Sequence, residues 1–519
     1  MNKHGNIVMI ALIVALGGFL MGFDASVISG VNKFIELEFK LTKLQLGWAV
    51  SSLTLISTLA MLIAGPLSDR YGRKTILSIA AVLYAISAIF SAFAPTFNIL
   101  VMARMIGGLG VGASLIIAPM YIAEISPAKV RGQMVSFNQL NIVIGISAAY
   151  FSNYFILQLA ESQEAWAQSL MFSEYTWRWM LGLEAIPAVI YFFALFIVPR
   201  SPRWLMMKQK FDEALAVMKR TSGEDKAASE FKKIKESVGS GENSVTRSVV
   251  WELFKPAMRL VITIGVVVGV LQQITGINSV FFYAPMIFEQ SGIGEDASFT
   301  QAIYVGLINL VFTILAMSLI DRLGRKPLLT IGLAGIAFFM FLLAYGFNSA
   351  TYTLTEESIA ALPEEVTTEK LTPLIGQTYE SDIAYKTEIQ RALGEQASAY
   401  ESPLIAAAIT MNPMLILIGI LGFVASFAIS VGPVMWVLFS ELFPNAIRGI
   451  AISFVGLINS AISFLVQLVF PWELANFGNS LTFLIYGVFA AIGFVFVWII
   501  VPETRGKSLE ELEATLVKS

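Results

Sequence analysis

The chain has 519 residues, of which 56% are hydrophobic and 14% are charged, and its mean hydropathy is +0.73. A soluble domain carries about 25% charged residues, so this composition excludes a soluble globular protein and indicates a membrane protein. The net charge of -3 indicates no nucleic-acid partner. With no cysteine and a single histidine, His4, the chain has no thiolate chemistry, and proton chemistry must fall to carboxylates.

Twelve apolar stretches of about 20 residues, the length that crosses a bilayer as a helix, follow one another along the chain. No small-residue cleavage site follows the first stretch, and Asp24 interrupts it, so we predict a retained span and not a signal peptide. Six stretches lie on each side of a polar segment at 199–257. The stretches are 6–31, 45–67, 75–93, 98–122, 132–157, 178–198, 258–289, 300–320, 327–347, 406–440, 448–472 and 479–501.

The two sets of six stretches carry the same motifs. The turn Asp69-Arg-Tyr-Gly-Arg-Lys74 recurs 252 residues later as Asp321-Arg-Leu-Gly-Arg-Lys326, and Glu124 with Arg131 is echoed by Glu441 with Arg448. The chain is therefore duplicated. We predict an all-α membrane protein with twelve transmembrane helices in two pseudo-symmetric six-helix bundles, and such repeats build a substrate site between them near the bilayer midplane.

The distribution of basic residues predicts the orientation. Most Lys and Arg residues fall in segments on one side of the predicted spans, so we expect both termini in the cytoplasm. The predicted domains are an N-terminal bundle at 1–198, a cytoplasmic linker at 199–257, a C-terminal bundle at 258–501 and a cytoplasmic tail at 502–519. Phe211, Leu215 and Met218 recur at helical spacing, which favours a small helical subdomain in the linker, with a plain connection as the alternative.

An extracytoplasmic insert at 348–405 interrupts the second bundle. It has ten acidic residues against three basic ones, Lys370, Lys386 and Arg391. Such a segment could gather cations or fold as a cap over an entrance, but this composition is typical of a soluble, poorly ordered insert. We assign it no chemistry.

These motifs resemble those of the sugar porter family within the major facilitator superfamily, especially the bacterial proton-coupled xylose, arabinose and galactose symporters. The resemblance covers nearly the whole chain. It implies the major facilitator fold, a bacterial inner membrane location, and proton symport of a monosaccharide, a pentose or a hexose, by alternating access. The residues that carry it are Gly22-Phe-Asp24, the two Asp-Arg-x-Gly-Arg-Lys turns, Pro119-Met-Tyr-Ile-Ala-Glu124 with Arg131-Gly132, Gln272-Gln-Ile-Thr-Gly-Ile-Asn278, Gly432-Pro-Val-Met-Trp436 and Val501-Pro-Glu-Thr-Arg-Gly506.

Charged residues at the cytoplasmic span ends form a candidate gating network. Glu124 and Glu441 lie where they could pair with Arg131 and Arg448, seven residues on in each copy. The resemblance implies further pairs with Arg73 and Arg325, and a part for Asp69. Several such pairs together could latch the two halves shut on the inner side, although each exposed pair contributes only about 0–1 kcal/mol.

Amide side chains inside predicted spans are candidate sugar ligands, because neutral donors and acceptors suit sugar hydroxyls in a dry cleft. Interhelical hydrogen bonding is the alternative role for each of them. Gln272 and Asn278 would face one ligand only if the helix unwinds near Gly276. The resemblance favours Gln139, Gln272, Gln273 and Asn278 as ligands, and Asn309 and Asn459 share the same amide chemistry.

Trp436 follows Gly432-Pro433, where a proline removes a backbone donor and permits a bend in the tenth span. The resemblance favours an indole that packs on the sugar ring over a packing or interfacial tryptophan. The sugar itself stays open, because Met21, Ile146, Phe282 and Ser460 replace more polar or larger residues of the xylose symporters.

Asp24 is the candidate proton carrier. It lies deep in the first span, and Arg104 lies at a similar depth in the antiparallel fourth span, so the two could pair. Protonation of Asp24 would release Arg104 and favour another conformation. A structural buried pair is the alternative. In the resembling family, proton-coupled members have Asp here and the facilitative glucose carriers of animals have Asn.

Other classes of function fit the sequence less well. An enzyme would need a reactive cluster within the spans, and neither such a cluster nor a metal-ligand spacing is present, so we expect no enzymatic activity, no metal and no cofactor other than the coupling proton. The expected partners are a monosaccharide, protons and the lipid bilayer, and we expect a monomer. A facilitative uniporter and a proton-coupled polyol carrier of the inositol type remain the alternatives.

Overall fold

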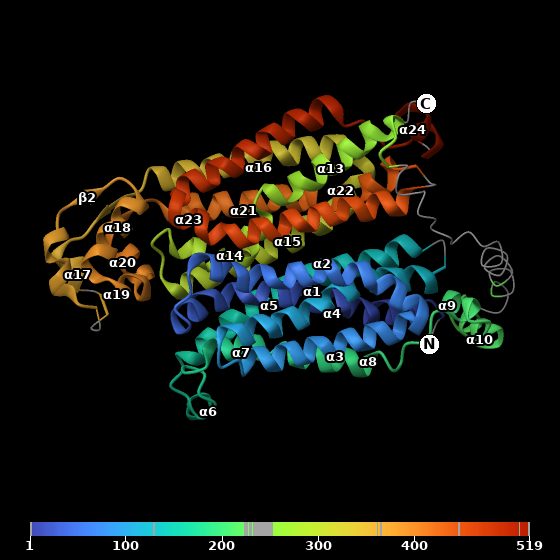
Figure 1. The fold of residues 1–519 in the computed structure, drawn as a ribbon, viewed down its shortest axis with the longest axis horizontal. Helices are drawn as coiled ribbons and strands as arrows, with labels where there is room; N and C mark the ends of the chain where they lie inside the picture. Colours follow the sequence, from blue (N-terminus) through green and yellow to red (C-terminus); the bar gives the residue numbers. More distant parts are fainter. Residues whose placement is uncertain are drawn as a thin grey trace. The chain divides into compact units, whose positions relative to one another are not determined.

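The computed structural model describes residues 3–127, 130–222, 227, 231, 253–360, 362–363, 366–444, 447–507 and 509–516. Its contacts divide the chain into two compact units (Figure 1). Unit 1 contains Met1–Val27, Ser52–Ser152 and Ser162–Ser248. Unit 2 contains Ile28–Ser51, Asn153–Glu161 and Val249–Ser519. The first, second and fifth long helices therefore contribute residues to both units.

Unit 1 is a bundle of apolar helices around a buried core of aliphatic and tyrosine side chains. Helix α3 packs along α4, α7 and α8, and buries Tyr84 in that contact. The helices that lie wholly or partly in unit 1 are α1 (Lys3–Glu38), α2 (Lys43–Tyr71), α3 (Arg73–Ala92), α4 (Phe97–Ile125), α5 (Arg131–Ala160), α6 (Ala165–Ser169), α7 (Thr176–Gly182), α8 (Ala185–Ala194), α9 (Pro202–Met207) and α10 (Phe211–Ser222).

Unit 2 holds the second set of long helices and the insert. Its helices outside the insert are η1 (Pro256–Met258), α13 (Arg259–Ile274), α14 (Ile277–Glu289), α15 (Glu295–Leu323), α16 (Arg325–Asn348), α21 (Pro413–Ile429), α22 (Val431–Leu442), α23 (Arg448–Ile500) and α24 (Leu509–Leu516). Within this unit α16 packs against α21 and α23, and α13 packs against α23.

The twelve predicted spans are accounted for. In the described part of the chain, ten helical segments are long and apolar enough to cross a membrane. One of them, α23, has 53 residues and contains two predicted spans that meet at Gly478, where the backbone leaves the helical region with a φ of 78°. The predicted sixth span is divided between α7 and α8 by a turn at Leu183 and Glu184.

The described part of the predicted linker is helical. Helices α9 and α10 cover Pro202–Met207 and Phe211–Ser222, and they pack together through Trp204, Leu205 and Ala214. The remainder of the predicted linker, apart from residues 227, 231 and 253–257, lies outside the described residues.

The prediction of a poorly ordered insert is wrong. The segment folds into a three-stranded antiparallel sheet in the order β2-β1-β3, covered by short helices (Figure 1). The prediction rested on net charge, which does not count the apolar residues that the sheet and the helices bury together. The elements are β1 (Thr351–Thr353), α17 (Glu356–Ala360), η2 (Thr368–Leu374), β2 (Thr378–Tyr379), α18 (Asp382–Leu393), α19 (Glu395–Ala399), α20 (Glu401–Ala408) and β3 (Ile409–Thr410).

Two buried tyrosines organise the insert. The rings of Tyr352 on β1 and Tyr385 on α18 stack with centroids 5.3 Å apart, and the Tyr385 hydroxyl donates to the Leu404 carbonyl on α20 at 2.7 Å. Tyr385 thus joins the sheet to two helices, and the core of the insert depends on it.

We predict that Tyr385→Ala unfolds the insert and leaves the long helices intact. Loss of a buried aromatic side chain costs about 3–5 kcal/mol, a large part of the stability of a small core. Limited proteolysis should cut the variant within 351–410 much faster than wild type. Far-UV circular dichroism should lose only the small helical signal of the insert. Thr387→Ala, an exposed change on the same helix, is the control. Equal protease resistance of Tyr385→Ala and wild type would contradict the prediction.

Candidate functional site

A buried ion pair joins α1 and α4 inside unit 1. Arg104 Nη1 donates to Asp24 Oδ1 at 2.6 Å and to the Asp24 carbonyl at 3.2 Å. The two residues are 2% and 0% exposed. Removing one partner of a buried pair leaves an uncompensated charge and costs about 3–5 kcal/mol. The pairing that the helix depths predicted is present.

The pair is close-packed but not fully hydrogen-bonded. Among the described residues, Asp24 Oδ2 and Arg104 Nε have no hydrogen-bond partner. Gly107, one turn after Arg104, makes room for the carboxylate, because a Cβ here would lie 2.7 Å from Asp24 Oδ2 and 2.6 Å from Ser87 Oγ. One face of the Asp24 carboxylate is therefore held by arginine, and the other lies against a glycine.

Glu184 is a third ionisable residue at this place, and it was not among the residues predicted from the sequence. It lies in the turn between α7 and α8, is 2% exposed and interacts electrostatically with both Asp24 and Arg104. Its Oε1 has no hydrogen-bond partner in the described part of the chain. The signal was present in the sequence, because Glu184 is an acidic residue within the predicted sixth span, and such residues are functional by default.

The amides of α13 and α14 converge because the helix breaks between them. Helix α13 ends at Ile274 and α14 begins at Ile277, and Gly276 between them has a φ of 89°, in the left-handed region that favours glycine. A Cβ at Gly276 would also lie 2.5 Å from the ring of Tyr486. The helix is therefore broken near Gly276, which is the condition under which Gln272 and Asn278 could face one ligand.

Four of the predicted amides form one hydrogen-bonded cluster. Asn278 Nδ2 donates to Gln273 Oε1 at 2.8 Å, and Gln273 Nε2 donates to Asn459 Oδ1 at 3.2 Å. Asn459 Nδ2 in turn donates to Gln272 Oε1 at 2.7 Å. Ser463, which sequence analysis missed, accepts from Asn278 Nδ2 at 2.7 Å, one turn after Asn459. The cluster is neutral and rich in donors and acceptors, which is the chemistry that hydroxyl groups need.

The other predicted ligands lie outside this cluster. Gln139 is exposed on α5 in unit 1. In unit 2, Asn309 is buried on α15, and Trp436 is 46% exposed on α22, with its ring edge-on to Phe439. The expected bend in the tenth span is confirmed and falls at Ser430, between α21 and α22.

The motif turn of unit 1 holds a buried charge pair. Arg73 Nη2 donates to Glu124 Oε1 at 3.0 Å, and Arg73 Nη1 donates to Asp69 Oδ1 at 2.7 Å. The Ser201 hydroxyl also donates to Glu124. The Trp204 indole donates to the Asp69 carbonyl at 3.1 Å, so the start of the linker packs on the same turn.

Unit 2 repeats this arrangement. Arg325 Nη2 donates to Glu441 Oε1 at 2.7 Å, and Arg325 pairs with Asp321 at 3.0 Å. Here the C-terminal tail replaces the linker. The Thr504 hydroxyl donates to Glu441 at 2.6 Å, and Glu503 accepts from the backbone N–H of Arg325 at 3.1 Å.

The expected pairs of Glu124 with Arg131 and of Glu441 with Arg448 are not formed among the described residues. Arg131 donates to the Ser126 carbonyl at 3.5 Å and Arg448 to the Phe443 carbonyl at 3.1 Å. The chain leaves the helix after each glutamate, so each later arginine meets a backbone carbonyl of this turn. Each observed glutamate pair ties helices of one unit, so a latch between halves does not follow from these pairs alone.

No group of three or more His, Asp and Glu side chains able to hold a metal occurs in the described part of the chain. The candidate chemistry of the two units therefore consists of the buried charges of unit 1 and the amide cluster of unit 2.

The chain matches the family described as sugar (and other) transporters over residues 10–362 and 399–516. It belongs to this family. The arabinose-proton symporter of Bacillus subtilis (strain 168) is 35% identical over 521 residues, covering 100% of this chain and 96% of the relative. The D-xylose-proton symporter of Escherichia coli (strain K12) is 34% identical over 552 residues, covering 99% and 97%.

The solved inward-open structure of the xylose transporter from E. coli is similar, with a TM-score of 0.73 and 34% identity over 98% of this chain and 100% of that one. Family and structural similarity confirm the resemblance to sugar porters. The predicted fold is also confirmed: this sugar transporter family member has the major facilitator fold with twelve transmembrane helices. It is a multi-pass membrane transporter and not an enzyme.

We predict that Gly107→Ala destabilises the protein. The added methyl group would displace the Asp24 carboxylate or Ser87, and overpacking of this kind costs about 1–3 kcal/mol. Thermal unfolding in detergent should show a lower Tm. Gly65→Ala on α2 is the matched control, because no atom lies within 4 Å of the new Cβ and alanine favours a helix. An unchanged Tm in Gly107→Ala would show that this packing does not constrain the pair.

Proposed function

We propose that this protein imports a monosaccharide, a pentose or a hexose, together with a proton by alternating access. The observation that carries the proposal is the buried Asp24–Arg104 pair with Glu184 beside it. The arabinose-proton and D-xylose-proton symporters that align over the whole chain support it.

The charges around Arg104 suit a proton site. If Asp24 and Glu184 were both ionised, two negative charges would face one guanidinium in a buried pocket, and an excess charge there is costly. One bound proton removes the excess. Protonation of Asp24 would also weaken its ion pair with Arg104. Proton binding would therefore favour a different arrangement of α1 and α4.

The amide cluster suits the sugar. Gln272, Gln273, Asn278 and Asn459 bond to one another in the structure, so a sugar would exchange these bonds for bonds to its hydroxyls. We propose Gln139, Asn309 and Trp436 as further substrate contacts. Because α13 and α14 meet at Gly276, this exchange would act directly on the angle between the two helices.

The remaining assignments complete this proposal. Residues 1–198 and 258–501 form the two halves that rock, joined by the linker at 199–257 and followed by the tail at 502–519. The termini and the two motif turns face the cytoplasm of a bacterial inner membrane, the insert faces outward, and the transporter acts as a monomer. Asp69, Arg73, Glu124, Arg131, Arg325, Glu441 and Arg448 shape the cytoplasmic gate.

We predict that Asp24→Asn abolishes accumulation of sugar against a gradient but preserves sugar binding and counterflow. Asparagine keeps the shape of the side chain and removes the proton that couples transport to the gradient. Uptake and counterflow in vesicles measure the two activities, and Glu174→Gln, an exposed carboxylate of unit 1, is the control. If wild-type vesicles show no sugar-induced proton uptake, or if Asp24→Asn accumulates sugar like wild type, uniport becomes the better explanation.

We predict that Gln273→Ala and Gln139→Ala each weaken sugar binding roughly 5- to 150-fold. Each variant leaves sugar hydroxyls unpaired, at a cost of about 1–3 kcal/mol. Binding of a panel of pentoses, hexoses and polyols by calorimetry measures the effect and identifies the substrate. Gln377→Ala in the insert should bind like wild type. Unaltered affinity in both site variants would assign these amides a structural role.

A further inference from the structure

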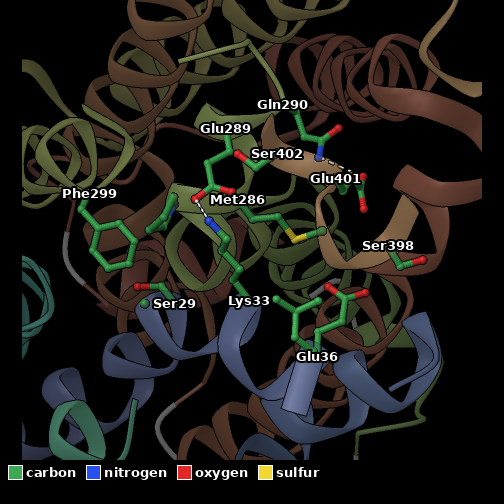
Figure 2. Close-up of a pocket in the computed structure, with 13 residues that line it drawn as sticks. Ser29, Lys33, Glu36, Met286, Glu289, Gln290, Phe299, Ser398, Glu401 and Ser402 are labelled. Atoms are coloured by element: carbon green, nitrogen blue, oxygen red, sulfur yellow. Dashed lines mark hydrogen bonds and ion pairs between the residues drawn. The ribbon is translucent and has the colours of Figure 1, made fainter. Parts of the chain in front are cut away.

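A network of charged side chains ties the outer ends of α1 and α2 to α14, α15 and the insert, all within unit 2. Lys33 on α1 pairs with Glu289 at the end of α14, at 3.4 Å, and with Glu295 at the start of α15, at 3.1 Å. Figure 2 shows Lys33 extending from α1 toward Glu289. Nearby, the Asn32 amide donates to the Phe282 carbonyl of α14 at 2.8 Å.

The insert supplies the second half of this network. Glu401, the first residue of α20, pairs with Lys43, the first residue of α2, at 3.5 Å, and with Lys386 of α18 at 2.9 Å. Gln290, directly after α14, donates to Glu401 at 3.1 Å (Figure 2). It also accepts from Lys386 at 2.7 Å. Lys43 also pairs with Glu36 of α1.

The insert is fastened separately to the last two spans. Asp382, the first residue of α18, accepts from the backbone N–H and the side-chain amide of Asn479, at 3.1 and 3.0 Å. It thereby caps the helix that restarts after Gly478, where a Cβ would lie 2.6 Å from Asp382 Oδ1. The insert is therefore anchored to α23 through Asp382. Its Glu401 contacts Lys43 of α2, and its Lys386 contacts Gln290 after α14.

The charged groups that line the hollows beside this network are already paired with one another. One is a cavity of about 50 Å³ lined by Ser29, Lys33 and Glu289, far below the roughly 300–1,000 Å³ of ligand pockets. A larger hollow of about 380 Å³ lies under the insert. Its charged groups, Lys43, Lys386 and Glu401, are bonded to one another, so they already have the partners that a ligand would supply.

The structure assigns the insert a mechanical role: we propose that it is a latch that holds the external side of the transport path closed. The proposal rests on the outward orientation and alternating access proposed above. Helices α1 and α2 begin or end in unit 1 and place only residues 28–38 and 43–51 in unit 2. The ion pairs of Lys33 and Lys43 therefore restrain the rest of both helices. The transport path can open to the outside only if these ion pairs break.

The chemistry of Glu401 suits a lasting contact. Burial alone would raise the pKa of its carboxyl, but the ammonium groups of Lys386 and Lys43 outweigh burial and hold the pKa well below its usual range. Glu401 is therefore ionised throughout the neutral range. The side chains of Lys43, Glu401 and Lys386 are only about a quarter exposed, so solvent screens them less than it screens fully exposed pairs.

The test measures access to one introduced thiol. The natural chain has no cysteine, so Ser29→Cys, at a residue that is 3% exposed beside Lys33, gives a single target. A membrane-impermeant maleimide added outside intact cells should label Ser29→Cys slowly. Adding Glu401→Gln or Lys43→Gln should raise the labelling rate about fivefold or more. Each change removes one partner of the Lys43–Glu401 ion pair.

Glu388→Gln in the Ser29→Cys background is the matched control. Glu388 lies on α18 and pairs with the exposed Arg391, so this variant should label at the rate of the Ser29→Cys parent. Equal rates in all four proteins would overturn the latch. A faster rate in Glu401→Gln alone, together with protease cleavage of the insert, would also overturn it, because unfolding of the insert would then explain the result.

Labelling uses neither sugar nor a proton gradient, so the latch and the proposed transport activity are tested separately. Faster labelling together with absent sugar-induced proton uptake would support the latch and reject the symport proposal. Inverted vesicles expose the cytoplasmic face of the membrane to the added maleimide. If Ser29→Cys were labelled only in these vesicles and not in intact cells, Ser29 would face the cytoplasm, and the external latch would be rejected.

Discussion

Charged and amide side chains buried in membrane-spanning helices depend on partners within the protein, and this constraint organises the transporter. Lipid offers no hydrogen bonds, so an unpaired charge or amide costs several kcal/mol. Asp24 and Arg104 meet most of this demand by pairing with each other, leaving Asp24 Oδ2 and Arg104 Nε without a partner among the described residues. The amides of α13, α14 and α23 meet it by bonding as a group. Because partners come from different helices, the polar residues fix how those helices pack.

The breaks in the long helices obey the same rule. Interrupting a helix frees backbone groups, and side chains bond to backbone groups at or near two of the breaks in unit 2. At the turn after Gly478, the Asn479 N–H donates to Asp382. Near the bend at Ser430, the Gly432 carbonyl accepts from Gln272 at 3.3 Å. The breaks are thus places where α13 and the insert are tied to distant parts of the chain.

How far the sequence predicted the molecule follows from the range of each interaction. Spans depend on local hydrophobicity and the break at Gly276 depends on a local glycine, so both were predictable. Glu184 was missed although its burial was predictable, because its proximity to Asp24 depends on how the sixth span divides into α7 and α8. The pairing of Arg131 with Glu124 was wrongly expected, because sequence spacing does not show where the chain leaves the helix. The insert was misjudged on net charge, which does not register residues such as Tyr385 that pack in a core.

Helix α14 links the two polar regions of unit 2 mechanically. It carries Asn278 near one end and Glu289 at the other, and it is kinked at Tyr283, where the φ of -129° leaves the helical region. At the rise of an α-helix its 13 residues span at most about 20 Å. A ligand shifts a conformational equilibrium only by the difference between its affinities for the two states. A sugar that binds the amides near Gly276 best in one position of α14 must therefore compete with, or reinforce, the contacts that Lys33 and Gln290 make at the far end. The strength of those distant charged contacts would then be part of the apparent affinity of the proposed sugar site.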